Sequence, residues 1–356
     1  MERVIGHGEK EKSGAVIAKD MRRAVLWLIL FALLVLSSCS EVGILKQKRP
    51  TLVSAASEDY LVGEKMNIDA DLLMGGFLFK MLDDTSAVFR FFGTDHLLAC
   101  VSFRTGDVRP IMFVGRGPAE MLDANFASRA YVRGGELLLN VFDTNEAVLK
   151  TIDIQKSMDA AAASIVQTRT MPMNCWMAFS LRDGYLFKVV LDSDGLSYKL
   201  FDNDDNEVKT VRFWKQGDVR KYYNYMSSAD CVKPDGSKLA MCFNCLDKVA
   251  LIDLNRNQRT TLVTDSKWRN VQDLNEMERQ LAAGESSDYY LYATCDDESI
   301  YALYYPGDEV RVFSWAGEYK NRIRLDHQVI CIDVSPDGSL FGVDMEGGVY
   351  RYDLPC

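Results

Sequence analysis

The stretch VKPDGSKL at residues 232–239 recurs as VSPDGSLF at residues 334–341. Each copy places a Pro-Asp-Gly turn between two apolar runs. Proline presets its own φ, aspartate bonds the nearby backbone, and glycine accepts a positive φ, so this tripeptide favours a tight turn. The offset from Pro234 to Pro336 is 102 residues, which indicates two repeat units rather than one. The turn residues are Pro234, Asp235 and Gly236 in one copy and Pro336, Asp337 and Gly338 in the other.

Weaker copies of this turn fill the intervals, at residues 92–98, 132–138, 181–187 and 294–301. Short runs rich in β-branched and aromatic residues follow them and are typical of strands. The 318 residues after residue 38, shared among six turns, give 53 residues per unit. Propeller blades are four-stranded sheets of roughly 40–50 residues, whereas a β-sandwich has no such repeat and a β-helix has a far shorter one. The sequence therefore predicts an all-β fold, a six-bladed β-propeller over residues 61–356.

Two details complete this fold prediction. The last repeat ends after its third strand, near residue 353, so residues 66–73 are expected to supply the missing fourth strand and close the ring. One segment breaks the β pattern, because Val271, Leu274, Met277 and Leu281 form a helical stripe. The prediction is one short helical insertion, lying across a face of the propeller.

The N-terminal sequence predicts that the protein is exported to the cell envelope. Residues 24–36 are uninterrupted apolar, which is 13 residues and short of the roughly 20 that span a bilayer. Met21, Arg22 and Arg23 precede them, and small residues follow up to Cys39, which resembles the lipobox of bacterial lipoproteins. We interpret residues 1–20 as an extension from a start codon assigned too early, 21–38 as a lipoprotein signal peptide and 39–60 as a tether. A transmembrane anchor is the disfavoured alternative, because the run is short and serines interrupt its end.

The net charge of the chain narrows the classes of partner that it can bind. The chain has a net charge of −10 and a pI of about 5.0, which argues against nucleic acid. Subtracting the six basic and four acidic residues of the first 38 leaves 35 Lys and Arg against 47 Asp and Glu, a net charge of −12. Such a body is repelled by anionic lipid, so acyl chains on Cys39 would hold it at the membrane. We expect an outer-membrane lipoprotein, facing the periplasm or the surface.

Residues 113–121, FVGRGPAEM, resemble the Gly-x-Gly-Pro-Gly-Glu-Phe stretch of the TolB-like six-bladed propeller lipoproteins of Bacteroidetes, and more distantly the NHL repeat. The tyrosine-rich residues 289–305 extend the resemblance, and Ala119 stands where the family usually has a third glycine. The family implies a secreted binding propeller with no catalytic set. Physically, the two glycines permit a sharp turn whose backbone donors the glutamate can bond; an anion-binding nest at the arginine is the second interpretation. The residues are Gly115, Arg116, Gly117, Pro118 and Glu120.

Metal and catalytic signals are sparse. The chain has three histidines, and the single C-x-x-C pair, Cys242 and Cys245, lacks a second pair at metal spacing. No catalytic residue, metal ligand or cofactor is therefore predicted. The eight cysteines after Cys39 show no compact disulfide framework, and buried thiols are favoured for most of them. Tyrosine clusters at 222–225 and 289–292 could be sugar platforms, but strand packing is favoured.

Two function hypotheses remain open. The first is a non-catalytic binding or scaffold propeller, with an envelope protein or a carbohydrate as ligand on its funnel face; a monomer and no nucleic acid are expected. The alternative is a lactonase-type hydrolase or lyase with calcium in the central channel, to which Asp230 and Asp333 could contribute. Because no inward acid or amide recurs at one blade position, the sequence favours binding.

Overall fold

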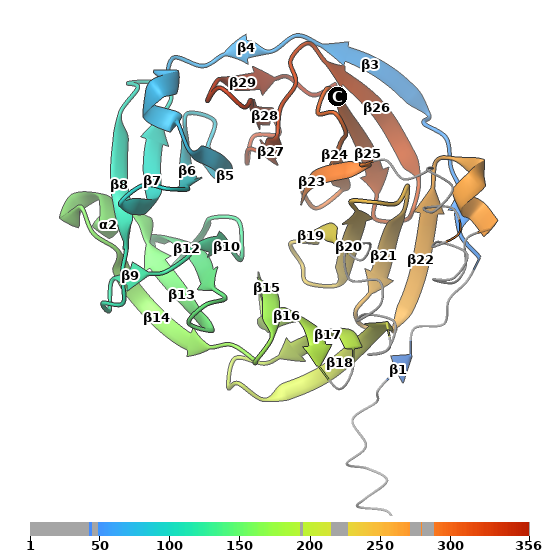
Figure 1. Cartoon of the computed structure of the whole chain (residues 1–356), viewed down its shortest axis with the longest axis horizontal. Helices are drawn as coiled ribbons and strands as arrows, with labels where there is room; N and C mark the ends of the chain where they lie inside the picture. Colours follow the sequence, from blue (N-terminus) through green and yellow to red (C-terminus); the bar gives the residue numbers. More distant parts are fainter. Residues whose placement is uncertain are drawn as a thin grey trace, which may run out of the picture. The chain divides into compact units, whose positions relative to one another are not determined.

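The computed structural model describes residues 43–44, 49–192, 195–214, 227–270, 279 and 288–355. Everything below concerns the unit 43–356. Its strands form six β-sheets around a common axis, as Figure 1 shows. The predicted six-bladed β-propeller is thus confirmed. The expected signal peptide, Cys39 and the helical stripe at 271–281 lie outside the described residues. Within those residues, no helix is long and apolar enough to cross a membrane.

The blades follow one another in chain order, and in each blade the strands run antiparallel from the axis outwards. Blade 1 contains β5 (Gly76–Asp83), β6 (Ser86–Phe91), β7 (His96–Ser102) and β8 (Val108–Val114), with β9 (Glu120–Met121) at its edge; blade 2 contains β10 (Asn125–Phe126), β11 (Tyr131–Arg133), β12 (Glu136–Asp143), β13 (Val148–Asp153) and β14 (Ser164–Thr170); blade 3 contains β15 (Cys175–Leu181), β16 (Gly184–Asp192), β17 (Gly195–Phe201) and β18 (Glu207–Trp214). The remaining three are blade 4 with β19 (Ser228–Val232), β20 (Lys238–Phe243), β21 (Val249–Asp253) and β22 (Gln258–Val263), blade 5 with β23 (Tyr290–Cys295), β24 (Ser299–Tyr304), β25 (Glu309–Ser314) and β26 (Tyr319–Leu325), and blade 6 with β27 (Cys331–Val334), β28 (Leu340–Val343) and β29 (Val349–Tyr352).

The two Pro-Asp-Gly turns connect the first and second strands of blades 4 and 6. In blade 4, Asp235 accepts a hydrogen bond from the Ser237 N–H at 2.8 Å, and Gly236 has a φ of +73°. Gly338 has the same role in blade 6 with a φ of +90°. Both turns therefore use the backbone chemistry that their sequence indicates.

An N-terminal belt, made of strands β1 to β4, runs along the outside of the propeller (Figure 1). Strands β1 (Gly43–Ile44), β2 (Thr51–Leu52) and β3 (Ser57–Leu61) add a parallel fifth strand to blades 3, 4 and 5. Residues of the stretch 39–60, for which the sequence predicts a tether, thus pair with three blades. The polar side chains of this stretch suggested a tether, but an edge strand is held by backbone hydrogen bonds and needs little apolar character.

Strand β4 (Glu64–Lys65) closes the ring as the fourth strand of blade 6, antiparallel to β29. The sequence placed this closure at residues 66–73, just after the observed strand. Only Met66 continues the pairing, donating to the Val349 carbonyl at 2.8 Å. Residues Ala70–Leu73 instead form the 3₁₀-helix η1, which begins where Asp69 accepts a hydrogen bond from the Asp71 N–H. The cap satisfies a backbone donor and turns the chain away from the sheet.

Apolar side chains fill the spaces between neighbouring blades. Phe103 of blade 1 stacks on Phe341 of blade 6 at 5.8 Å between ring centroids, inside a cluster that joins these two blades. The described residues contain one longer α-helix, α2 (Ile154–Ala160), in the connection between β13 and β14. Asp153 caps its N-terminus by accepting from the Lys156 N–H at 3.0 Å. A seven-residue helix was too short for its periodicity to appear in the sequence.

Candidate functional site

A polar cavity of about 670 Å³ lies where blades 4 and 5 meet; we call it the blade 4/5 cavity. Both blades and the belt contribute to its walls. The blade 4 segments are the turn between β20 and β21 and the connection after β22. The blade 5 segments are the beginning of β23, the end of β24 and the beginning of β25. Its lining residues are Leu52, Asp247, Thr264, Asp265, Ser266, Lys267, Tyr289, Tyr304 and Arg311.

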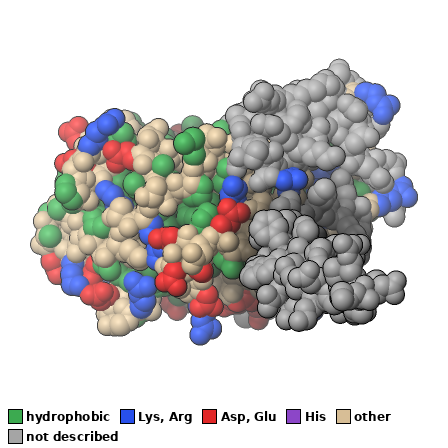
Figure 2. Space-filling model, turned by 90° about the horizontal axis from the view of Figure 1, so that it is seen from below, with side chains coloured by type: hydrophobic (Ala, Val, Ile, Leu, Met, Phe, Trp, Pro, Cys, Tyr) green, Lys and Arg blue, Asp and Glu red, His purple; other side chains and the backbone are tan. Residues whose placement is uncertain are grey.

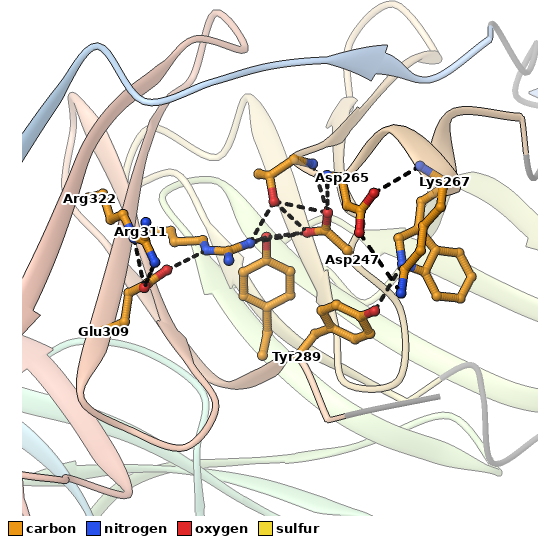
Figure 3. A network of polar contacts seen from close by, with 10 residues as sticks. Asp247, Asp265, Lys267, Tyr289, Glu309, Arg311 and Arg322 are labelled. Atoms are coloured by element: carbon orange, nitrogen blue, oxygen red, sulfur yellow. Dashed lines mark hydrogen bonds and ion pairs between the residues drawn. The ribbon is translucent and has the colours of Figure 1, made fainter. Parts of the chain in front are cut away.

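Asp247 organises the blade 4 side of this cavity (Figure 3). Its side chain is buried, and its carboxylate accepts hydrogen bonds from the Thr264 N–H at 2.8 Å, the Asp265 N–H at 2.6 Å and the Thr264 hydroxyl. It also contacts Arg311 Nη1 at 3.2 Å and accepts from the Tyr290 hydroxyl at 3.3 Å. A buried carboxylate needs such partners to offset its desolvation. Asp247 therefore fixes the connection after β22 against blade 5.

Arg311 supplies the opposite wall. Its Nε donates to Glu309 at 2.8 Å, and its guanidinium carbon lies 3.4 Å from the centre of the Tyr304 ring. Glu309 in turn accepts from Arg322, so it bridges two guanidinium groups (Figure 3). Burial alone would lower the pKa of Arg311, but Tyr290, Glu309, Tyr304 and Asp247 outweigh it and raise that pKa. The guanidinium is therefore a permanent, rigidly placed cation.

The cavity offers donors and acceptors without a net charge. Two lining carboxylates, Asp247 and Asp265, balance two cations, Lys267 and Arg311. The Tyr289 hydroxyl accepts a hydrogen bond from Trp268 Nε1 at 3.0 Å, which leaves its own proton for another partner. Such a set of hydroxyls, aromatic rings and balanced charges is suited to an uncharged ligand with many hydroxyl groups.

Burial and ion pairs shift the pKa values of three groups in and beside this cavity. Burial raises the pKa of Tyr290 well above its ordinary value, and burial also raises the pKa of Tyr304. For Glu309, burial would raise the pKa, but hydrogen bonds from Arg311 and Arg322 hold it below its usual value. The tyrosines are therefore protonated and the glutamate ionised at neutral pH, far from the pKa range of a general acid or base.

The two aspartates that could contribute to a calcium site are each paired with a lysine, in different blade interfaces. Asp333 contacts Lys80 Nζ at 3.2 Å between blades 6 and 1, and Asp230 contacts Lys188 Nζ at 2.8 Å between blades 3 and 4. Each is a buried structural partner of a lysine. Among the described residues, no group of three or more His, Cys, Asp or Glu side chains is placed to hold a metal ion.

The structure also places the cysteines and one of the two tyrosine clusters. Six of the seven cysteines in the described part are buried, and Cys245 is half-buried. Burial raises the pKa of the Cys175 and Cys331 thiols to about 12, so both stay protonated. Tyr289 and Tyr290 are both buried, as the packing interpretation predicts, and Tyr289 also lines the cavity. The other tyrosine cluster, at 222–225, lies outside the described residues.

The Gly-Arg-Gly-Pro stretch forms the turn between β8 and β9. Glu120 folds back and accepts a hydrogen bond from the Gly117 N–H at 2.8 Å. A Cβ atom on Gly115 would lie 2.0 Å from Glu120 Oε2, so a side chain at this position would require the Glu120 carboxylate to move. The carboxylate occupies the donor that an anion-binding nest would need, which supports the turn interpretation; Arg116 is exposed beside it.

Sequence reasoning missed Asp247, Glu309 and Arg311. The turns between the second and third strands of blades 2 and 6 also carry an aspartate, but at another position of the turn. Asp143 accepts from the Leu122 N–H at 2.7 Å in blade 2, and Asp344 accepts from the Gly348 N–H at 2.8 Å in blade 6. Asp143 and Asp344 lie five residues before the next strand, whereas Asp247 lies two residues before β21, so no repeated spacing marks it in the sequence. Nothing marks Arg311 either, because its contacts with Asp247 and Thr264 reach into another blade.

Comparisons with known proteins add the fold only. No protein-family model and no curated protein matches the chain, so the TolB-like resemblance gains no support beyond the propeller itself. Solved structures are similar to it at low identity. A streptogramin B lyase has 9% identity and a TM-score of 0.49 over 83% of this chain and 98% of that one. Regucalcin from Agrobacterium tumefaciens has 11% identity and a TM-score of 0.46 over 84% of this chain and 96% of that one. The WD40 β-propeller domain of Doa1 has 12% identity and a TM-score of 0.44 over 82% of this chain and 95% of that one.

Proposed function

We propose that this chain is a non-catalytic binding propeller that holds a small carbohydrate in the blade 4/5 cavity. The observation that carries the proposal is the side-chain set of that cavity: two tyrosines, two carboxylates and two cations with no net charge. Arg311 is already oriented by Glu309 and by the Tyr304 ring, so little side-chain entropy is lost when a ligand binds. Carbohydrate hydroxyls both donate and accept, which matches the mixture of groups on the walls.

The state of the charged groups supports binding over catalysis. Asp247 and Glu309 are occupied by hydrogen bonds and ion pairs, and each belongs to the structure of the blade interface. A hydrolase of lactonase type would need converging oxygen ligands for calcium, and Asp230 and Asp333 are the carboxylates that the sequence offers as candidates. Both of these carboxylates are bonded to lysines in different blade interfaces.

Removing one hydroxyl tests the cavity. Titration calorimetry of the full chain against glucose, mannose, N-acetylglucosamine, maltose and cellobiose should reveal binding of at least one of them. Tyr289→Phe should weaken that binding about tenfold, because a lost hydrogen bond is worth roughly 1–1.5 kcal/mol. Tyr301→Phe is the matched control, since this tyrosine is also buried in blade 5 but donates to Asp296 at 2.8 Å and does not line the cavity.

Binding of acetate or phosphate, but of no sugar in the panel, would replace the carbohydrate by an anionic ligand of Arg311 and Lys267. Equal affinities for Tyr289→Phe and Tyr301→Phe would place the sugar elsewhere. Thermal stabilisation by calcium after chelation, abolished by Asp230→Asn or Asp333→Asn, would favour the lactonase hypothesis instead.

We also propose that acyl chains on Cys39 hold the propeller at the outer membrane, on the strength of the lipobox-like end of residues 21–39. Expressed in a Gram-negative host, the full chain should incorporate labelled palmitate and fractionate with the outer membrane. Cys39→Ala should abolish both, whereas Cys245→Ala should change neither. Label retained by Cys39→Ala would contradict the anchor.

A further inference from the structure

A second surface, where blade 6 meets blade 1, exposes apolar side chains; we call Leu72, Met74, Phe92 and Met345 the methionine patch. These residues come from three segments: η1 and the residue after it, the turn between β6 and β7, and the turn between β28 and β29. They are 50%, 66%, 43% and 70% exposed, in that order. The patch shares no lining residue with the blade 4/5 cavity.

The three segments are in direct contact. The Phe92 N–H donates to the Gly75 carbonyl at 2.9 Å, which places Phe92 beside the residue that follows Met74. A Cβ atom on Gly347 would lie 2.7 Å from the Ala70 carbonyl oxygen and 3.5 Å from the Leu73 side chain. The turn that carries Met345 therefore packs on η1, and the three segments that carry the exposed side chains lie together.

The surface combines a rigid aromatic base with flexible side chains. Phe92 stacks on Phe77 at 6.2 Å, and the Arg90 guanidinium lies 4.0 Å from the centre of its ring. Arg90 is itself bonded to Asp123, so the ring is fixed from below. Around it, unbranched methionines adapt to different apolar shapes, a property that peptide-binding surfaces use repeatedly. Contiguous exposed apolar surface of this kind marks an interaction site.

The charged side chains around the methionine patch indicate which kind of partner would bind it. Residues 66–77, 92–95 and 344–348 hold five acidic side chains and no Lys or Arg. Four of these acids, Asp69, Asp71, Asp95 and Glu346, are exposed around the patch. The fifth, Asp344, is used within its own turn. An apolar centre with an acidic rim complements a segment that carries apolar residues on one side and Lys or Arg on the other.

We infer that the methionine patch docks an amphipathic, basic helical segment of a partner protein. The helix would lay its apolar side on Met74, Phe92 and Met345, and its basic residues would face the acidic rim. A lipid surface is the less suitable occupant, because the rim repels anionic headgroups. This inference is independent of the carbohydrate proposed for the cavity.

The probe is a labelled 18-residue helical peptide of leucine and lysine, titrated into the full chain by fluorescence anisotropy. The double variant Met74→Glu/Met345→Glu should bind at least tenfold more weakly. Asp71→Lys/Glu346→Lys should also lose at least tenfold and show a shallower salt dependence. Met173→Glu is the matched control, because this methionine is 84% exposed in the connection between blades 2 and 3, and it should change the affinity less than twofold.

A leucine–glutamate peptide of the same length should not bind. Because every substituted side chain is exposed, each variant should keep the circular dichroism spectrum and melting temperature of the parent, and binding is compared only between such variants. Equal binding to the parent and the Met74/Met345 variant would reduce the effect to general charge attraction and overturn the inference. Co-sedimentation of the Cys39→Ala chain with phosphatidylcholine vesicles, lost in Met74→Glu/Met345→Glu, would assign the patch to a membrane instead.

Discussion

Replacing Asp333 by alanine is expected to lower the free energy of unfolding by about 3–5 kcal/mol, the usual cost of leaving a buried charge without its partner. The carboxylate is fully buried and contacts Lys80 Nζ at 3.2 Å, with only 12% of that lysine side chain exposed. It also accepts from the Met81 N–H at 2.9 Å and the Thr294 hydroxyl at 2.6 Å. One side chain thus joins blades 5, 6 and 1. Urea denaturation of parent and variant measures the loss.

The ion pair also predicts a pH dependence. Burial would raise the pKa of Asp333, but Lys80, Arg129, Thr294 and the Met81 N–H outweigh it and hold that pKa below its usual range. The stabilisation is therefore present above about pH 4 and is lost as pH falls through the lower folded pKa. Burial would lower the pKa of Lys80, yet Asp333 raises it overall, so this contribution is lost only as pH rises beyond the ordinary lysine range. The difference between parent and Asp333→Ala should shrink in acid.

Two further variants decide whether the Asp333–Lys80 ion pair causes the loss of stability in Asp333→Ala. Asp337→Ala changes an exposed aspartate of the same blade and should cost less than about 1 kcal/mol. In the Lys80→Met background, Asp333→Ala should cost much less than alone, because no uncompensated ammonium remains buried. Additive losses would show that Asp333 acts through its backbone and threonine contacts and not through the ion pair.

The fold could be predicted because its information is local. Pro234 to Gly236 and Pro336 to Gly338 determine their turns by their own chemistry, and six such turns imply six sheets. The belt escaped prediction for the opposite reason. Strands β1, β2 and β4 have two residues each, too short for an alternation pattern, and their hydrogen bonds come from blades far along the chain.

The candidate site was less predictable than the fold. Tyrosines near residue 289 stood out as a cluster, yet packing was the better-supported interpretation, and Tyr290 is indeed packed. The sequence did not single out Arg311, because the role of this arginine depends on its contact with Asp247, 64 residues away in another blade. The same holds for Lys80 and Asp333, which are 253 residues apart. Polar contacts between blades require knowledge of which blades are neighbours and in what register, and a single sequence does not contain that directly.

Removing the belt should have an effect as large as that of Asp333→Ala. A chain that begins at residue 66 lacks β4, the fourth strand of blade 6, and the parallel strand β3, which pairs with β26 over five residues. Blade 6 would keep three strands, and the edges of β22, β26 and β29 would lose their backbone partners. We expect a loss of at least about 3 kcal/mol, which lowers the melting temperature by roughly 6–12 °C in a domain of this size. Differential scanning calorimetry of the truncated and parent chains measures it.

A chain that begins at residue 49 is the matched control, since it lacks only the two-residue β1 among the described belt strands and should melt within about 3 °C of the parent. Adding a synthetic peptide of residues 49–66 in trans separates strand pairing from a general folding defect. If the belt acts by pairing with strand edges, this peptide should raise the melting temperature of the chain that begins at residue 66, and a scrambled peptide should not. Identical melting of the chains that begin at residues 49 and 66 would mean that blade 6 is stable with three strands. The ring would then be closed by the apolar contacts between blades 6 and 1, such as Phe103 on Phe341, and not by β4.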